Sequence, residues 1–114
     1  MNKKARGYGG ESLAVQYLEN KGYEIISRNE KIAGVEIDVL ARYEDYYVFC
    51  EIKTREGDGY GTGVESVTTT QRRRYIRAAQ FYLAQRGREN YSARFDVIEI
   101  MRDKINHVED AFQG

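Results

Sequence analysis

The stretch that decides the fold is residues 36–53, which read EIDVLARYEDYYVFCEIK. Read as a hairpin with its turn centred between Glu44 and Asp45 and no bulge, it pairs Asp38 with Glu51 and places Glu36 opposite Lys53. Opposed side chains of an antiparallel pair emerge on one face with Cβ atoms about 4.5–5.5 Å apart, and like charges there repel each other. The hairpin therefore predicts two carboxylates that need a compensating positive charge.

Two sources of positive charge are compatible with this pattern. One is a hard divalent cation, because carboxylate oxygens suit Mg2+, which usually keeps open positions for a phosphate. Asp38 and Glu51 would hold the ion for phosphodiester hydrolysis, and Lys53 would orient a water or stabilise the charge growing on the phosphoryl oxygens. The other is Lys53 itself, which lies on the face of Glu51 because strand side chains alternate, and which would then form a structural ion-pair cluster. The residues alone favour neither.

A resemblance to known nucleases begins at these residues. Asp38, twelve intervening residues and Glu51-Ile52-Lys53 resemble the D-x(n)-E-x-K core of the PD-(D/E)xK nuclease superfamily. More closely, the chain resembles the uncharacterised YraN-like family within it. That likeness rests on seven ordered segments: Gly10-Glu11, Gly22-Tyr23, Arg28-Asn29, Glu36-Ile37-Asp38 and residues 48–55, 94–97 and 110–112.

The chain departs from the family pattern in two places. Ile37 stands where the superfamily has a proline before the first acid, and the chain has no proline. Gly34-Val35 stands where YraN-like sequences often read Gly-Gly. The second difference bears on the local loop geometry rather than on the pair of acids.

The resemblance implies a fold and an activity. The fold is α/β, with a restriction endonuclease-like core in which helices flank a single mixed β-sheet. The length of 114 residues independently predicts one domain over residues 1–114. The activity is Mg2+-dependent (or Mn2+-dependent) hydrolysis of nucleic acid, with Asp38 and Glu51 as metal ligands, the Ile52 carbonyl as an extra ligand and Lys53 as the catalytic lysine. DNA is the expected partner, and a homodimer is expected if two strands are cut. A nucleic-acid-binding module that does not cut, and a protein-interaction adaptor, remain the alternatives.

Two further residues each have a functional and a structural interpretation. Glu11 projects beside the apolar side of an expected helix, and the resemblance makes it a candidate third carboxylate; otherwise an acid in the first turn favours the helix dipole. Gln71 follows Thr68 at capping-box spacing, and capping is the interpretation that we favour. Gln71 also begins a Q-x-x-x-Y segment that resembles RecB-like nucleases, in which the glutamine lies near the active site.

The charge is unevenly distributed although its sum is zero. Arginines dominate residues 71–94, and acids dominate residues 30–65. Arg73, Arg74 and Arg77 fall opposite the apolar stripe of their expected helix, where they are free to meet backbone phosphates. An ordinary solvated helix face is the alternative.

The glycine-rich segment that follows the E-x-K strand offers two more candidate contacts. Arg55 and Tyr60 lie in this loop, which could close over a strand of nucleic acid, and Tyr60 could stack on a base. The loop lacks the spacing of a phosphate-binding P-loop. A surface loop without such a role is equally compatible with its composition.

The rest of the chain sets the expected framework. Cys50 is the only cysteine, which predicts a small core residue and a reducing, cytoplasmic location. The charged first seven residues precede no apolar run, so we expect neither secretion nor a membrane span. His107, the only histidine, has no partner for a zinc site. Helices are expected at 11–21 and 68–86, and further strands at 23–29, 94–101 and 105–108.

Overall fold

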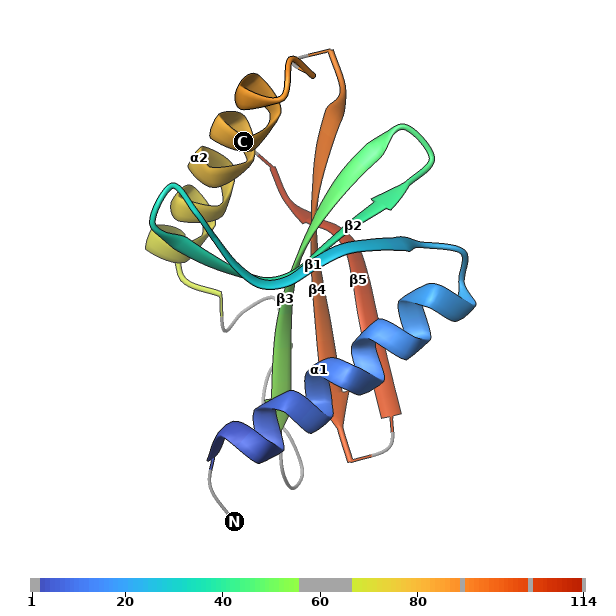
Figure 1. Cartoon of the computed structure of the whole chain (residues 1–114). Helices are drawn as coiled ribbons and strands as arrows, with labels where there is room; N and C mark the ends of the chain where they lie inside the picture. The colour runs from blue at the N-terminus through green and yellow to red at the C-terminus, as the bar shows by residue number, and fades with distance from the viewer. Residues whose placement is uncertain (1–2, 56–66, 89, 103, 114) are drawn as a thin grey trace.

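The computed structural model describes residues 3–55, 67–88, 90–102 and 104–113. Two helices flank one five-stranded sheet with the strand order β1-β2-β3-β4-β5 (Figure 1). The elements are α1 (Lys3–Asn20), β1 (Glu24–Ile32), β2 (Val35–Tyr43), β3 (Tyr46–Arg55), α2 (Thr69–Gln85), β4 (Ser92–Met101) and β5 (Lys104–Phe112). The expected α/β architecture with a single mixed sheet is confirmed.

The sheet is mixed because one neighbouring pair differs from the others. β3 and β4 run parallel, and the connection between them contains α2, whereas the other neighbours pair antiparallel. Two apolar clusters fill the two faces of the sheet, one built with α2 and the other with α1. The helices therefore cover opposite faces, and β3 in the middle is buried from both sides.

Burial from both sides explains the apolar run in β3. Phe49 packs in the cluster under α2, while Val48, Cys50 and Ile52 pack in the cluster under α1. Cys50 is fully buried, so its expected place in the core is confirmed. The same alternation directs Glu51 and Lys53 toward the α2 face, as the period of two predicts.

Helix α1 is longer than the sequence pattern suggested. It begins at Lys3 rather than at Glu11 and ends before Gly22, whose φ of +94° is the left-handed conformation expected after a last turn. The start was missed because glycines at 7, 9 and 10 argue against a helix. Gly10 has a packing role instead, since a Cβ there would clash with Thr54 Oγ1 on β3.

The remaining elements lie close to their expected positions. α2 begins after Thr68, which caps it, and its last turn gives way to Gly87 at φ +65°. β5 extends well beyond the predicted residues 105–108 because Phe112 packs against Phe95, with ring centroids 5.1 Å apart. Within the described residues, no helix is long and apolar enough to cross a membrane.

Candidate functional site

The predicted register of the β2–β3 hairpin is confirmed near the turn but does not extend to the acids. The ladder runs from Tyr43 paired with Tyr46 to Val39 paired with Cys50. Toward Glu36 on β2 and Lys53 on β3, each strand stays paired only with its outer neighbour, β2 with β1 and β3 with β4. The pairing between β2 and β3 therefore ends at Val39 and Cys50. Asp38 and Glu51 therefore lie just past the end of the ladder.

The two predicted acid pairings are corrected accordingly. Asp38 does not pair with Glu51, and Glu36 lies opposite Lys31 of β1 rather than Lys53. The cause is the Asp38 carboxylate, whose Oδ2 accepts a hydrogen bond from the Ile52 amide at 2.9 Å. This side chain takes the donor that a continued ladder would give to a main-chain carbonyl.

A tyrosine from α2 joins the two acids. The buried Tyr75 hydroxyl donates to Glu51 Oε2 at 2.5 Å and accepts from the Asp38 amide at 3.4 Å. Tyr75 thereby links the Glu51 carboxylate to the main-chain amide of Asp38. The acids come together at the point where the strands separate, although no direct strand pairing holds them.

Lysine 53 neutralises only one of the acids. Its Nζ lies 3.4 Å from Glu51 Oε1, and its side chain is 27% exposed. Within the described ranges, Asp38 forms no ion pair with any residue. The interpretation in which Lys53 compensates both acids also requires an ion pair between Lys53 and Asp38, and the described residues show none.

The protonation of Asp38 reflects this incomplete compensation. Burial, and next the negative charge of Glu51, raise the pKa of Asp38 to about 7, against the lowering effect of the Ile52 amide. Glu11 and Glu36 add smaller contributions in the same direction. The site thus holds an acid whose charged form would gain from a nearby cation.

Glu11 is oriented toward this region by a neighbouring strand. Asn29 Nδ2 donates to Glu11 Oε1 at 2.9 Å, and Asn29 adopts a positive φ of 54° in β1. Because α1 begins at Lys3, Glu11 lies in the middle of the helix rather than in its first turn. The interpretation based on the helix dipole is therefore wrong, whereas its role as a third carboxylate stays a prediction.

The side chain of Gln71 does not complete the capping box that we favoured from the sequence. Thr68 Oγ1 accepts from the Gln71 amide at 3.1 Å, so the threonine half of the capping box is formed. The Gln71 side chain points elsewhere, since its Nε2 donates to Glu51 Oε1 at 2.9 Å. The Gln71 side chain therefore lies beside Glu51 rather than at the N-terminus of α2.

A cleft adjoins the acids on the α2 side. It has a volume of about 490 Å³ and lies between the β1–β2 turn and α2, which approach each other in Figure 1. Gln71 and Tyr75, which both donate hydrogen bonds to Glu51, form part of its wall. Its lining is Ala33, Gly34, Val35, Glu36, Gln71, Arg74, Tyr75 and Arg77.

The expected nucleic-acid contacts divide into separate groups. Arg73, Arg74 and Arg77 are all exposed as predicted, but only Arg74 and Arg77 line the cleft. Arg55 lies with its Nε 2.5 Å from Glu99 Oε2, a charge contact with a buried acid. Tyr60 lies outside the described residues.

Two residues of this region escaped the sequence reasoning. Tyr75 was given no role of its own, and Glu99 was not singled out. Glu99 is 3% exposed and lies beside Lys53 in the parallel register of β3 and β4. A sequence signal existed for each residue: an acid inside the apolar strand 97–100, and the tyrosine of the Q-x-x-x-Y segment.

The donor set at Asp38 and Glu51 fits one type of cation. In the part of the chain that the structure describes, no three Asp, Glu, His or Cys side chains converge as a metal-binding group. Two carboxylates are nonetheless what Mg2+ sites usually offer, with waters and substrate phosphates completing the shell. The pair therefore fits Mg2+ or Mn2+ and lacks the nitrogen and sulfur ligands of zinc.

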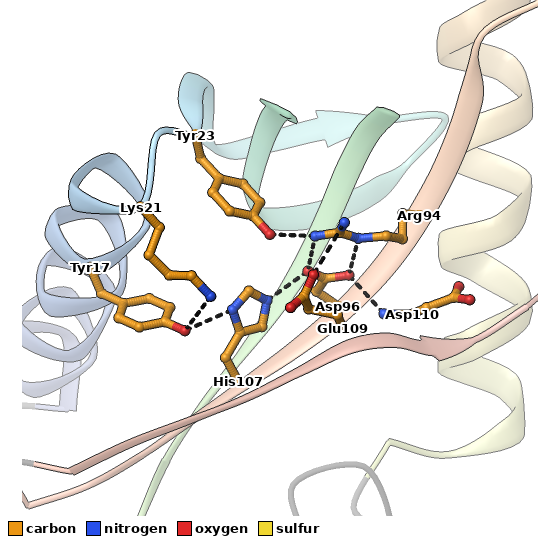
Figure 2. A network of polar contacts seen from close by, with 8 residues as sticks. All are labelled: Tyr17, Lys21, Tyr23, Arg94, Asp96, His107, Glu109 and Asp110. Atoms are coloured by element: carbon orange, nitrogen blue, oxygen red, sulfur yellow. Dashed lines mark hydrogen bonds and ion pairs between the residues drawn. The ribbon is translucent and has the colours of Figure 1, made fainter. Parts of the chain in front are cut away.

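A second polar network lies on the α1 side and is drawn in Figure 2. Asp96 of β4 is fully buried and accepts two hydrogen bonds from Arg94, at 2.9 and 2.8 Å. His107 Nε2 lies 2.6 Å from Asp96 Oδ2, and the Asp110 amide donates to Oδ1 at 3.0 Å. Burial acts to raise the pKa of Asp96, but these bonds outweigh it and hold that pKa below its ordinary value.

The fold and site define an α/β protein with one mixed sheet and a pair of acids at the point where its central strands separate. The chain belongs to the uncharacterised protein family UPF0102, whose profile matches residues 10–100. It is 43% identical to a UPF0102 protein of Alkaliphilus oremlandii, over 98% of this chain and 100% of the relative. It is 39% identical to one of Clostridioides difficile, with the same coverage, and 38% identical to one of Caldanaerobacter subterraneus, over 98% of both chains.

Proposed function

We propose that this protein is a nuclease that hydrolyses phosphodiester bonds with the help of Mg2+ or Mn2+. The observation that carries the proposal is Asp38, a part-buried acid close to Glu51 that has no cationic partner among the described residues. Burying acids close together is costly unless a cation compensates them, so such an arrangement favours a site that binds one. DNA is the substrate that we propose first.

Each residue of the site has a distinct task in this proposal. Asp38 and Glu51 hold the cation, with the Ile52 carbonyl as a further ligand and Glu11 as an accessory acid. When bound, the cation supplies a water of lowered pKa and polarises the phosphoryl oxygen. Tyr75 and Gln71 fix the Glu51 carboxylate through its two oxygens, which keeps it oriented for binding.

Lys53 acts on the substrate in the same proposal. Its ammonium is partly exposed beside Glu51, where it can donate to a phosphoryl oxygen or to an attacking water. A cation placed where negative charge develops lowers the barrier most. Arg74 and Arg77, along the neighbouring cleft, grip backbone phosphates on the way to the acids.

Cleavage assays test the activity directly. Labelled DNA and RNA, in single-stranded, duplex and branched forms, are incubated with the protein with and without Mn2+. We expect Mn2+-dependent products, with rates reduced about 100-fold or more in Asp38→Ala and Lys53→Ala, since such preorganised groups contribute about 3 kcal/mol. Asp45→Ala on the hairpin turn and Lys31→Ala on β1 are matched controls and should cut normally.

The alternative function is a module that binds nucleic acid without cutting it. The arginine-lined cleft alone would serve that purpose. Calorimetry with Mn2+ separates the two functions, because a module of this kind has no need of a metal at Asp38. Unchanged cleavage in both site variants, or no metal binding together with no cleavage of any substrate, would reject the nuclease.

A further inference from the structure

We infer that the outer face of α2 guides a single-stranded nucleic acid toward the acids, with Phe81 as a base-stacking platform. This inference rests on the proposed function and names the form of its substrate. Phe81 is 45% exposed although it is a large aromatic residue. It lies on the same helix as the two arginines that line the cleft.

The spacing on α2 aligns these three side chains. Arg74, Arg77 and Phe81 lie three and four residues apart, so they form one stripe along the helix surface. All three are exposed, whereas Tyr75, Ala78 and Tyr82 point into the core. The stripe covers about 10 Å of helix length, which corresponds to about three nucleotides at the stacked spacing of one strand.

The stripe also leads to the acids. Gln71 lies one turn before Arg74, lines the same cleft and donates to Glu51. A strand that lies along the stripe therefore meets, in order, an aromatic face, two guanidinium groups and the glutamine that contacts the site. Basic groups that follow the backbone are thus combined with an aromatic side chain, as in proteins that bind single strands.

Two observations favour a single strand over a duplex. Bases offer their faces to a protein ring only when they are unpaired, and an exposed phenylalanine presents no group that reads a base edge in a groove. The cleft volume of about 490 Å³ suits a ligand of roughly nucleotide size. Single-stranded DNA and RNA share this chemistry, so both are included in the test.

A binding assay tests the inference independently of cleavage. Fluorescently labelled oligothymidylate, oligouridylate and a duplex of equal length are titrated with the full chain in EDTA, where no metal-dependent cutting occurs. We expect the single strands to bind more tightly than the duplex. Phe81→Ala should weaken single-strand binding about tenfold, the effect of losing roughly 1.4 kcal/mol of stacking, while Phe81→Trp should restore it.

Matched variants control for exposure and charge. Leu13→Ala removes an apolar side chain of similar exposure, 44%, from α1 on the other face of the sheet, and should leave binding unchanged. Arg74→Gln and Arg77→Gln should each reduce the salt dependence of single-strand binding by about 0.7 in the logarithmic slope. Arg73→Gln, outside the cleft, should change it less.

A base analogue reports the stacking itself. An oligonucleotide with 2-aminopurine should lose fluorescence on binding to the wild-type chain and keep it with Phe81→Ala. Equal or tighter duplex binding, or a Phe81→Ala affinity within twofold of that of Leu13→Ala, would overturn the inference. Either result leaves the metal-dependent cleavage assay standing, whereas an inactive protein that binds as expected would reject only the nuclease.

Discussion

The sheet buries acids in two places that differ in how the charge is compensated. Asp96 on the α1 side accepts hydrogen bonds from Arg94, His107 and the Asp110 amide (Figure 2). Asp38, where β2 and β3 part, accepts one from the Ile52 amide. The pKa of Asp96 is held low, whereas that of Asp38 is raised to about 7.

The difference separates a structural acid from a candidate functional one. Every described contact of Asp96 favours its ionised form, so nothing further is needed there. Asp38 is destabilised in its charged form by burial and by Glu51, which leaves a favourable interaction for a cation to supply. The two acids are therefore expected to respond in opposite ways to neutral substitution, metal and pH.

The largest expected effect is the loss of the Asp96 partner. Arg94→Leu leaves the buried Asp96 carboxylate without its guanidinium and should lower the free energy of unfolding by about 3–5 kcal/mol. Urea denaturation measures the change. Glu109→Gln, at a partner of Arg94 that is 51% exposed, should cost less than about 1 kcal/mol. A small effect of Arg94→Leu would show that Arg94 does not stabilise the Asp96 charge, and the proposed difference between Asp96 and Asp38 would be rejected.

A divalent cation should stabilise the chain through Asp38. At a Mg2+ or Mn2+ concentration of about 100 times its dissociation constant, the free energy of unfolding should rise by about 2.7 kcal/mol. Thermal melting in metal and in EDTA measures this gain. Asp38→Asn should abolish it, and Asp45→Asn should not. A gain that survives Asp38→Asn would place the cation elsewhere.

Removing the charge of Asp38 should stabilise the metal-free protein. The asparagine side chain in Asp38→Asn keeps an acceptor for the Ile52 amide but removes the repulsion with Glu51. One pKa unit corresponds to about 1.4 kcal/mol, so after allowance for solvent screening we expect Asp38→Asn to gain about 1–2 kcal/mol at pH 8. Urea denaturation in EDTA measures the gain. Asp96→Asn should instead destabilise the fold, and loss of stability in both variants would contradict the distinction.

The smallest expected effect is the pH dependence of that gain. The folded-state pKa of Asp38, about 7, lies above its ordinary value of 3.8, so the folded chain binds more protons between these values. Its contribution to stability therefore falls as the pH rises from about 4 to 7. Plotted against pH, the free energy of unfolding of the wild type should approach that of Asp38→Asn near pH 4. The difference between the two should change by about 1 kcal/mol per pH unit or less.

Asp96 should show the opposite dependence. Its pKa is lowered in the folded state, so its stabilisation is present above its ordinary pKa and is lost as the pH falls through the lowered value. Denaturation curves of wild type and Asp96→Asn between pH 2 and pH 8 would measure this loss. If the stabilities of wild type and Asp96→Asn converged at high rather than at low pH, the pKa of Asp96 could not be lowered by folding.

Much of the fold could be predicted because it depends on local patterns. The alternation along β3 correctly placed Glu51 and Lys53 on one face and Cys50 on the other. The turn at Glu44-Asp45 correctly set the register as far as Val39 and Cys50. These features follow from the strand period and the turn position, which neighbouring residues determine.

The features that were missed depend on contacts between distant segments. The end of the ladder depends on the Asp38 side chain and on the separate partners of β2 and β3. The direction of Gln71 depends on Glu51, and the need for a glycine at position 10, inside α1, depends on the nearby Thr54 of β3. Sequence periodicity contains no information about such pairs until the segments are placed together.

The buried cysteine has a practical consequence for spectroscopy. Burial raises the pKa of the Cys50 thiol well above its ordinary value, so the thiolate that reacts with maleimide probes is scarce in the folded chain. A single cysteine introduced at an exposed position, such as Leu13→Cys, would then be the only readily labelled site. Dyes or spin labels could be attached there without first removing the native thiol, and their signals would come from one known place on the molecule.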